Sequence, residues 1–256
     1  MHWTRQQRRL AYVVVAFFFM SWNFRRFLLS ISPWSPQYML PSILIAWMVV
    51  GLSYKQEDLP WEVPLYFGLL KTIPLLPLER LCRGNLTSFT MVLLIVFSFT
   101  FVFFLKRESF KELFTGNLKE KIDYSYSFPN SWLQVTGLFI LVFTAWFFFK
   151  KAIIEGVIPL ISLNLLQHAF LTALYTSLAV FSIPIIFLRR RLDREELLLG
   201  LALGFGLFER YFMIGSFVGT LIFLAIGWLL ARTSYETRGS LLSSLMIFVY
   251  ILMVIL

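Results

Sequence analysis

Long apolar runs constrain this chain more than any other feature of its sequence. The run Leu86–Leu105 holds no charged residue, and several other runs approach the same length. A helix needs about 20 apolar residues to cross the hydrocarbon core of a bilayer. Because lipid offers no hydrogen-bond partners, a spanning segment must be a helix or part of a closed barrel, and barrel strands alternate between polar and apolar residues. The runs do not alternate, so the sequence predicts an all-α fold, a polytopic transmembrane helical bundle.

The amino-acid composition supports this prediction. Hydrophobic residues make up 59% of the 256 residues and charged residues only 14%, about half the usual charged share. A soluble domain of this length buries about three quarters of its surface and covers the rest with polar groups. The chain has too few polar groups for that, so its composition excludes a soluble globular enzyme, a disordered chain and a disulfide-stabilised scaffold.

The apolar runs predict eight or nine helices in a single membrane domain that covers residues 1–256. Six runs are clear, and three are interrupted by charged residues, proline or glycine. The clear runs are Tyr38–Tyr54, Leu86–Leu105, Trp132–Phe149, Ala169–Leu188, Tyr211–Ala231 and Ser240–Leu256. The interrupted runs are Leu10–Leu29, Trp61–Leu78 and Leu197–Phe208, the last of which could extend back over Glu195 and Glu196.

Basic residues set the expected orientation. The formal net charge is +9, and Lys and Arg lie in short segments between the apolar runs, as topology signals do. With nine alternating spans these segments fall on one side, which the positive-inside rule makes cytoplasmic. The N-terminus is then cytoplasmic and the C-terminus lies outside. The expected location is the inner (plasma) membrane of a bacterium.

The same charge distribution bears on the expected partners. The basic residues form no patch with interleaved aromatic residues, so the positive charge does not indicate nucleic-acid binding. The expected partners are the lipid bilayer and another integral membrane protein.

The one sizeable loop covers residues 106–131 and is expected on the cytoplasmic side. Phe110, Leu113 and Phe114 have the i, i+3, i+4 spacing of one helix face. We therefore expect Glu108–Leu118 to form a short amphipathic helix on the membrane surface.

Charged and polar residues within spans are rare, and by default they are functional candidates. The weak candidates for catalysis are His168, Glu195, Glu196 and Glu209. A lone histidine on an apolar background more often bonds a neighbouring helix than a ligand. The adjacent glutamates are expected in a solvated cytoplasmic turn. Glu209 and Arg210 are expected in a loop at the outer face, with a buried pair as the alternative.

The sequence predicts no cofactor and no metal site. Its one cysteine, Cys82, excludes an internal disulfide and a thiolate cage. Two histidines, His2 and His168, are too few for a histidine-built metal centre. No paired catalytic arrangement, zinc-protease helix, phosphate-binding loop or nucleotide fingerprint is present.

Small residues at four-residue spacing give a structural signal. Gly200 and Gly204 form one pair, and Gly215 and Gly219 form another. Such pairs let helix backbones approach closely in membranes, so these glycines are predicted to serve helix packing.

Four stretches near the C-terminus follow one another in a distinctive order. Leu188–Leu192 reads LRRRL, Gly204–Glu209 reads GFGLFE, Phe217–Ala231 is an apolar helix, and Tyr235–Leu245 reads YETRGSLLSSL. The segment 173–256 resembles the CPBP family of intramembrane proteases, also called the CAAX-protease or bacteriocin-processing family. The last stretch is similar to that family's Y-E-R-T-G-S-L-W-A-S-I-L sequence.

The resemblance implies where catalytic residues would lie. In that family, one motif supplies a Glu pair and an Arg, and later motifs supply two His and an Asn. The Glu pair falls on Thr176–Ser177 and the Arg on Phe181. The two His fall on Glu209 and Phe248, and the Asn on Leu252. A water-activating site needs a base, and Phe and Leu supply neither hydrogen bonds nor metal ligands, so the resemblance implies a pseudoprotease.

A second register places the Glu pair on Glu195 and Glu196, with Gly200 in place of the Arg. The chain is then too short for every later motif, and no later histidine exists. The first hypothesis is therefore a non-catalytic membrane scaffold or partner-binding protein. The second is an atypical active protease that uses Glu195, Glu196, Glu209 and His168. The third is a small-solute or lipid transporter. This hypothesis is disfavoured because the spans contain few polar residues, which a substrate pathway usually needs.

Overall fold

A computed structural model of the chain describes Thr4 and residues 62–73, 86–106, 110–122, 129–156, 162–190, 192–213 and 217–255. Within these ranges the secondary structure is helical, and the only β pairing is one antiparallel bridge between Lys121 and Ser131. The all-α prediction is confirmed at this level. The spans predicted over Leu10–Leu29 and Tyr38–Tyr54 lie outside the described residues.

The chain divides into two compact units. The first unit comprises Met1–Thr90 and Ile183–Arg232, and the second comprises Met91–Ser182 and Thr233–Leu256. Helices α4 and α10 and the helix that begins with α7 each contribute to both units. The prediction of a single membrane domain stays a prediction.

Three helices in the described ranges are long and apolar enough to cross a membrane. They are Ser88–Lys106 within α4 (Leu86–Lys106), Trp132–Ile154 and Leu163–Leu188. They correspond to three of the predicted spans, which supports a membrane protein, whereas the complete bundle of eight or nine spans stays a prediction. The third helix begins at Leu163 rather than at Ala169, because the Ser162 hydroxyl caps it by accepting a hydrogen bond from the Leu165 amide at 3.2 Å.

Two of these helices contain a π-helical segment. Helix α6 (Trp132–Phe148) continues into η3 (Phe149–Ile154). Helix α7 (Leu163–Thr176) continues through η4 (Ser177–Ser182) into α8 (Ile183–Leu188).

Pro184 gives a physical reason for the η4 segment. Proline has no amide hydrogen, and its ring crowds the carbonyl four residues earlier, which belongs to Val180 inside η4. A π-helical turn shifts the hydrogen bonding by one residue. The apolar helix therefore continues across the proline to Leu188 instead of ending before it.

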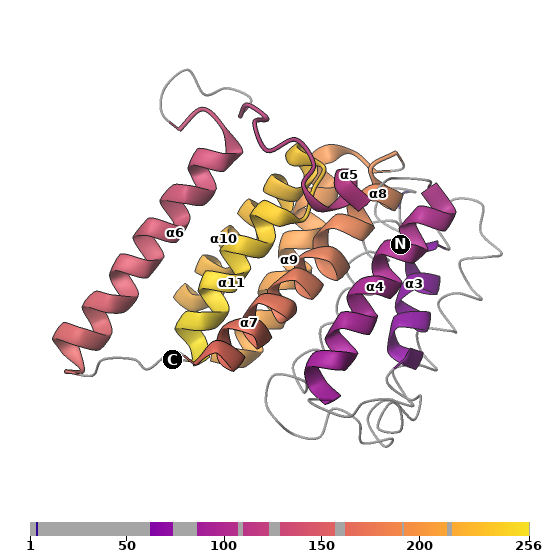
Figure 1. Ribbon diagram of the computed structural model, residues 1–256. Helices are drawn as coiled ribbons and strands as arrows, with labels where there is room; N and C mark the ends of the chain where they lie inside the picture. The colour runs from indigo at the N-terminus through magenta and orange to yellow at the C-terminus, as the bar shows by residue number, and fades with distance from the viewer. Residues whose placement is uncertain are drawn as a thin grey trace. The chain divides into compact units, whose positions relative to one another are not determined.

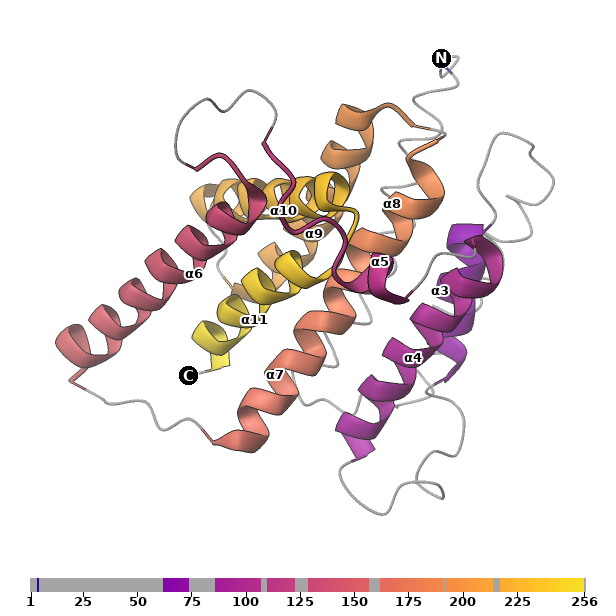
Figure 2. The same cartoon turned by 45° about the horizontal axis from the view of Figure 1, so that its top comes forward.

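In the second unit, α11 (Leu241–Ile255) packs against α6, α7 and η4. Figures 1 and 2 show α11 between α6 and α7. The most apolar window of the Leu163–Leu188 helix is 83% buried, whereas that of Trp132–Ile154 is 11% buried. Helix α6 and its continuation η3 therefore present most of their surface outward, including Leu141 and Trp146 of α6 and Ile153 of η3, with 65%, 57% and 69% exposure.

In the first unit, α3 (Glu62–Thr72) contacts α8. Helices α9 (Arg194–Met213) and α10 (Phe217–Thr237) approach each other closely at Gly227. A Cβ atom there would lie 3.0 Å from the Phe205 ring and 3.1 Å from the Ala202 carbonyl oxygen. The close approach expected from small residues thus occurs at a glycine outside the predicted pairs.

The boundary between α9 and α10 corrects the prediction of one span over Tyr211–Ala231. The structure ends α9 at Met213 and begins α10 at Phe217. Glu209 and Arg210 lie within α9 rather than in a loop, since both residue types favour helix.

The start of α9 and the short helix α5 give two further corrections. Glu195 and Glu196 occupy the first turn of α9, as the alternative of a backward extension predicted, and not a separate turn. The amphipathic helix α5 covers only Phe110–Phe114. It ends there because Gly116 adopts a positive φ of 56°, a conformation that terminates helices.

Candidate functional site

Three segments meet at one end of the second unit: the chain after α5, the start of α6, and the turn between α10 and α11. The Asn117 amide donates to the Thr237 carbonyl at 2.7 Å. The Ser240 amide donates to the Leu113 and Phe114 carbonyls, each at 3.1 Å. These backbone bonds hold the chain after α5 against the α10–α11 turn.

Two glycines make this contact possible. A Cβ atom on Gly116 would lie 2.1 Å from the Thr237 carbonyl oxygen and 2.6 Å from the Gly239 nitrogen. A Cβ atom on Gly239 would lie 2.6 Å from the Gly116 nitrogen. The two backbones touch without side chains between them, so a larger residue at either position requires the backbone to move.

A tryptophan ties the start of α6 to the same turn. The Trp132 indole Nε1 donates to the Glu236 carboxylate at 2.5 Å, and Trp132 is 2% exposed. A buried indole N–H usually needs an acceptor, and a carboxylate makes that bond charge-assisted.

A chain of buried serine hydroxyls lies between α10, η4 and α11. Ser234 Oγ donates to Ser243 Oγ at 2.7 Å, and Ser243 Oγ lies 2.6 Å from Ser177 Oγ. Ser177 Oγ donates to the Ser240 carbonyl at 2.9 Å. These four residues, with exposures of 0–1%, form what we call the serine cluster.

Two arrangements of the hydroxyl protons satisfy the serine cluster. Each hydroxyl has one proton to donate, and in one arrangement Ser234 donates to Ser243, Ser243 to Ser177, and Ser177 to the Ser240 carbonyl. Ser243 Oγ also lies 3.1 Å from the Ser240 carbonyl, so its one proton can go there instead, with Ser177 then donating to Ser243. In both arrangements the chain of hydroxyls joins Ser234, Ser243 and Ser177 and ends on the Ser240 carbonyl.

The hydrogen bonds of the serine cluster join α10, η4 and α11. In the described part of the chain, each hydrogen bond of the serine cluster goes to another hydroxyl or to backbone. A serine nucleophile needs an adjacent base, and no imidazole or carboxylate is bonded to the cluster within these ranges. Hydroxyl bonds between membrane helices average about 0.6 kcal/mol each.

Five of the positions that the CPBP resemblance aligns lie in the second unit, on α7, η4 and α11, which pack together; Glu209 lies in the first unit. Thr176 donates to the Thr172 carbonyl at 2.8 Å, and Ser177 belongs to the serine cluster. Phe181 is fully buried. The Phe248 ring meets the Phe170 ring edge-on at 6.0 Å between centroids. Hydroxyl bonds and aromatic packing therefore occupy these positions.

The candidate residues from the sequence lie in different parts of the chain. His168 is half-buried in α7 of the second unit. In the first unit, Glu195 is exposed and Glu196 is half-buried at the start of α9, where acidic residues favour the helix dipole. The backbone of Glu209 lies in α9, and its side chain lies outside what the structure describes. In the described ranges, no cluster of three His, Cys, Asp or Glu could hold a metal ion.

The glycines from the sequence are only partly described. Gly200 is buried in α9, whereas Gly215 lies outside the described residues. Gly204 and Gly219 are helical, and their surroundings are not described. The close backbone contacts fall instead at Gly116, Gly227 and Gly239.

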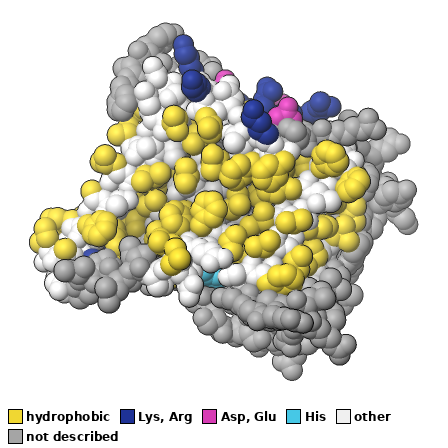
Figure 3. All heavy atoms as spheres, viewed as in Figure 1, with side chains coloured by type: hydrophobic (Ala, Val, Ile, Leu, Met, Phe, Trp, Pro, Cys, Tyr) yellow, Lys and Arg dark blue, Asp and Glu magenta, His cyan; other side chains and the backbone are white. Residues whose placement is uncertain are grey.

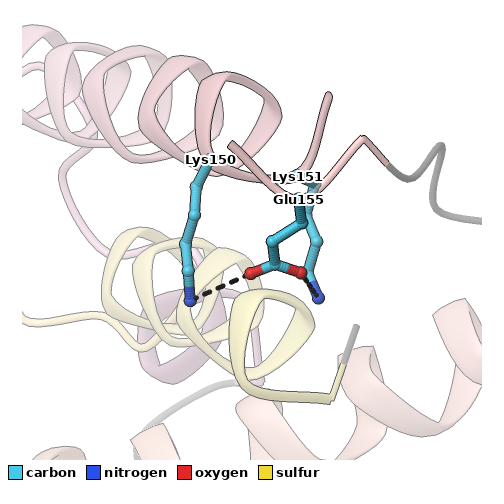
Figure 4. Close-up of polar contacts among 3 residues, drawn as sticks. All are labelled: Lys150, Lys151 and Glu155. Carbon is cyan, nitrogen blue, oxygen red and sulfur yellow. Dashed lines mark ion pairs between the residues drawn. The ribbon is translucent and has the colours of Figure 1, made fainter. Parts of the chain in front are cut away.

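An ion pair closes the opposite end of α6. Lys151 Nζ lies 2.8 Å from Glu155 Oε2, and Lys150 Nζ lies 3.5 Å from Oε1 (Figure 4). The hydrogen bond from Lys151 lowers the pKa of the Glu155 carboxyl below its ordinary value, with a smaller contribution from Lys150. Lys150 and Lys151 thus share a compensating negative charge.

Sequence reasoning missed the serine cluster and the glycine contact. The sequence Thr115-Gly116-Asn117 carries turn-forming residues that could have placed the end of α5. The serines gave no local signal, because Ser177 is distant in sequence from its partners. In comparisons with known proteins, the chain matches no protein-family model, no curated protein and no solved structure.

Proposed function

We propose that this chain is a non-catalytic integral membrane scaffold with a CPBP-like arrangement of its C-terminal helices. The observation that carries the proposal is the serine cluster. Ser177 stands where the resemblance expects a catalytic carboxylate, and its hydroxyl is hydrogen-bonded to the Ser240 carbonyl and to the Ser243 hydroxyl. A group with its bonds used in this way stabilises helix packing and has no base beside it.

The proposed mechanism is lateral binding of another integral membrane protein to α6. This helix has the least buried apolar window of the three candidate spans. Its exposed Trp146 stacks on the exposed Phe149 of η3, with 6.2 Å between the ring centroids. Aromatic residues are enriched at protein interfaces, and stacked rings present a stiff surface to an apolar partner helix.

Site-specific photocrosslinking in native membranes tests this mechanism. A crosslinking amino acid at Leu141 should give a discrete adduct with another membrane protein. The matched control is Phe104 on α4, which is 75% exposed and also apolar. Equal adducts from both positions, or lipid adducts alone at Leu141, would contradict a scaffold interface on α6.

One observation favours the second candidate, an atypical intramembrane protease. Glu196 Oε2 is buried and has no hydrogen-bond partner within the described ranges, and an unsatisfied buried carboxylate oxygen invites a functional explanation. The test is cleavage of a co-expressed membrane substrate by the native chain and by Glu196→Gln. Loss of cleavage in that variant, with Glu195→Gln as the exposed neighbouring control, would replace the scaffold proposal.

A further inference from the structure

Four basic side chains at the site end of the second unit are exposed and have no ion pair in the described part of the chain. They are Lys111, Lys119, Lys121 and Arg238. Three described carboxylates lie at the same end: Glu112 is exposed on α5, Glu120 bonds the Asn117 side-chain amide, and Glu236 bonds the Trp132 indole. The four basic residues exceed these carboxylates by one positive charge. The dark blue side chains along the upper margin of Figure 3 include this end, above the hydrophobic surface.

The short helix α5 fixes the depth of this end. Its Phe110 ring lies 4.3 Å from the Phe99 ring of α4, and its Phe114 ring lies 6.5 Å from the same ring. Phe99 lies about 10 Å along α4 from Lys106, at 1.5 Å per residue. Helix α5 therefore folds back against the flank of a candidate span, and Phe110 is 61% exposed there.

Arg238 has an unfavourable backbone conformation. Its φ is +57°, directly after the last residue of α10. Glycine is the usual residue at this left-handed helix-capping position, because a side chain there is strained. Arg238 is exposed, and glycine would adopt this conformation without strain. The feature of Arg238 that needs an explanation is therefore its positive charge.

We propose that Lys111, Lys119, Lys121 and Arg238 bind the anionic headgroups of lipids in the adjacent leaflet, with Phe110 inserted at the acyl boundary. Unpaired basic side chains next to a span attract anionic headgroups, and long basic side chains extend from an apolar stem to that level. At the other end of α6, Lys150 and Lys151 both form ion pairs with Glu155. The proposed preference for anionic lipids therefore belongs to one end of the second unit. The proposal holds whether or not a protein partner binds α6.

Spin-label lipid EPR on the full chain in phosphatidylcholine vesicles tests this inference. The probes are trace spin-labelled phosphatidylglycerol and, for comparison, spin-labelled phosphatidylcholine. The native protein should select phosphatidylglycerol, and the variant K111Q/K119Q/K121Q/R238Q should lose about fivefold of that selectivity, the contribution of about one uncompensated basic residue. Because the Debye length is about 3 Å at 1 M salt, high salt should remove the native selectivity as well.

Two comparisons make the result decisive. The matched variant K150Q/K151Q should keep the native selectivity, and millimolar inorganic phosphate should not displace the lipid. Arg238→Gly should lower the lipid selectivity and raise the melting temperature, because glycine removes the strain of the positive φ. This result would separate the effect of losing the charge from the effect of losing the fold. Unchanged selectivity in the quadruple variant, an equal loss in K150Q/K151Q, or displacement by phosphate would overturn the proposal.

Discussion

Replacing Gly116 by alanine should destabilise the second unit more than any other glycine-to-alanine change described here. The new Cβ would lie 2.1 Å from the Thr237 carbonyl oxygen, well inside van der Waals contact. Both neighbours are backbone atoms, so no side chain can rotate away. The chain after α5 must lift from the α10–α11 turn, which lengthens or breaks the Asn117–Thr237 hydrogen bond of 2.7 Å.

The expected loss in the free energy of unfolding combines three costs and one gain. An alanine at φ +56° costs about 1–2 kcal/mol, and reduced freedom of the unfolded chain returns about 0.4–1 kcal/mol. Overpacking costs about 1–3 kcal/mol. Loss of one backbone hydrogen bond adds about 1 kcal/mol. Together these effects predict destabilisation by about 4 kcal/mol.

A series of three glycines separates these contributions. Gly156 also has a positive φ, of +65°, but its Cβ would meet no atom within 4 Å. Gly156→Ala therefore reports the backbone strain alone, about 1 kcal/mol. Gly137 lies in α6 with open space around it, and Gly137→Ala should stabilise that helix by about 0.5–1 kcal/mol.

The assay is unfolding of the full chain in mixed micelles by titration with sodium dodecyl sulfate. Circular dichroism follows the loss of helix, so the stabilities of all three variants are measured on one scale. The expected order of stability is Gly137→Ala, native, Gly156→Ala and then Gly116→Ala. If Gly116→Ala costs no more than Gly156→Ala, the backbone contact between the chain after α5 and the α10–α11 turn does not form, and the reasoning fails.

Three further predictions concern the polar contacts. Ser243→Ala removes two hydroxyl bonds of the serine cluster and should cost about 1 kcal/mol in the same titration, whereas Thr100→Ala, which removes a hydroxyl bonded within its own exposed helix face, should cost nothing measurable. Trp132→Phe deprives the Glu236 carboxylate of its indole donor and should lower the free energy of unfolding by about 1–3 kcal/mol. The loss should be smaller in a Glu236→Gln background. Equal losses in both backgrounds would argue against the bond. The pKa of the Glu155 carboxyl, followed by carboxyl-carbon NMR, should lie below its ordinary value of 4.5. Its pairing with lysine therefore stabilises the fold above pH 4.5, and this stabilisation is lost as the pH falls through the lowered pKa of the folded state. Lys151→Gln should raise the pKa of Glu155 more than Lys150→Gln does.

The described spans were predictable because a helix needs only sufficient length and apolar residues to cross a bilayer. The runs Leu86–Leu105 and Trp132–Phe149 contain no charge and correspond to two of the candidate spans. Pro184 did not end the third span, since η4 accommodates it. The α9–α10 boundary was misplaced because the adjacent charges of Glu209 and Arg210 resembled a loop, although both residue types are compatible with helix.

The candidate site was not predictable, because its contacts join residues distant in sequence. Ser177 meets Ser243 only after α11 packs against η4. Nothing near Gly116 in the sequence indicates that its missing side chain makes room for Thr237. Periodicity finds the faces of helices, whereas it carries no information about which hydroxyl lies opposite another.

The placement of polar groups connects the scaffold proposal with the lipid proposal. The buried hydroxyls of the serine cluster bond each other and the backbone, whereas the described basic side chains at the two ends of α6 are exposed or partly exposed. In a water-activating protease the interior must keep a polar group with free bonding capacity, which costs stability. In the scaffold proposal, the bonded hydroxyl of Ser177 takes the place of such a group and contributes to helix packing. In the two proposals together, a second molecule binds to the outward apolar face of α6 or to the basic side chains at one end of the second unit.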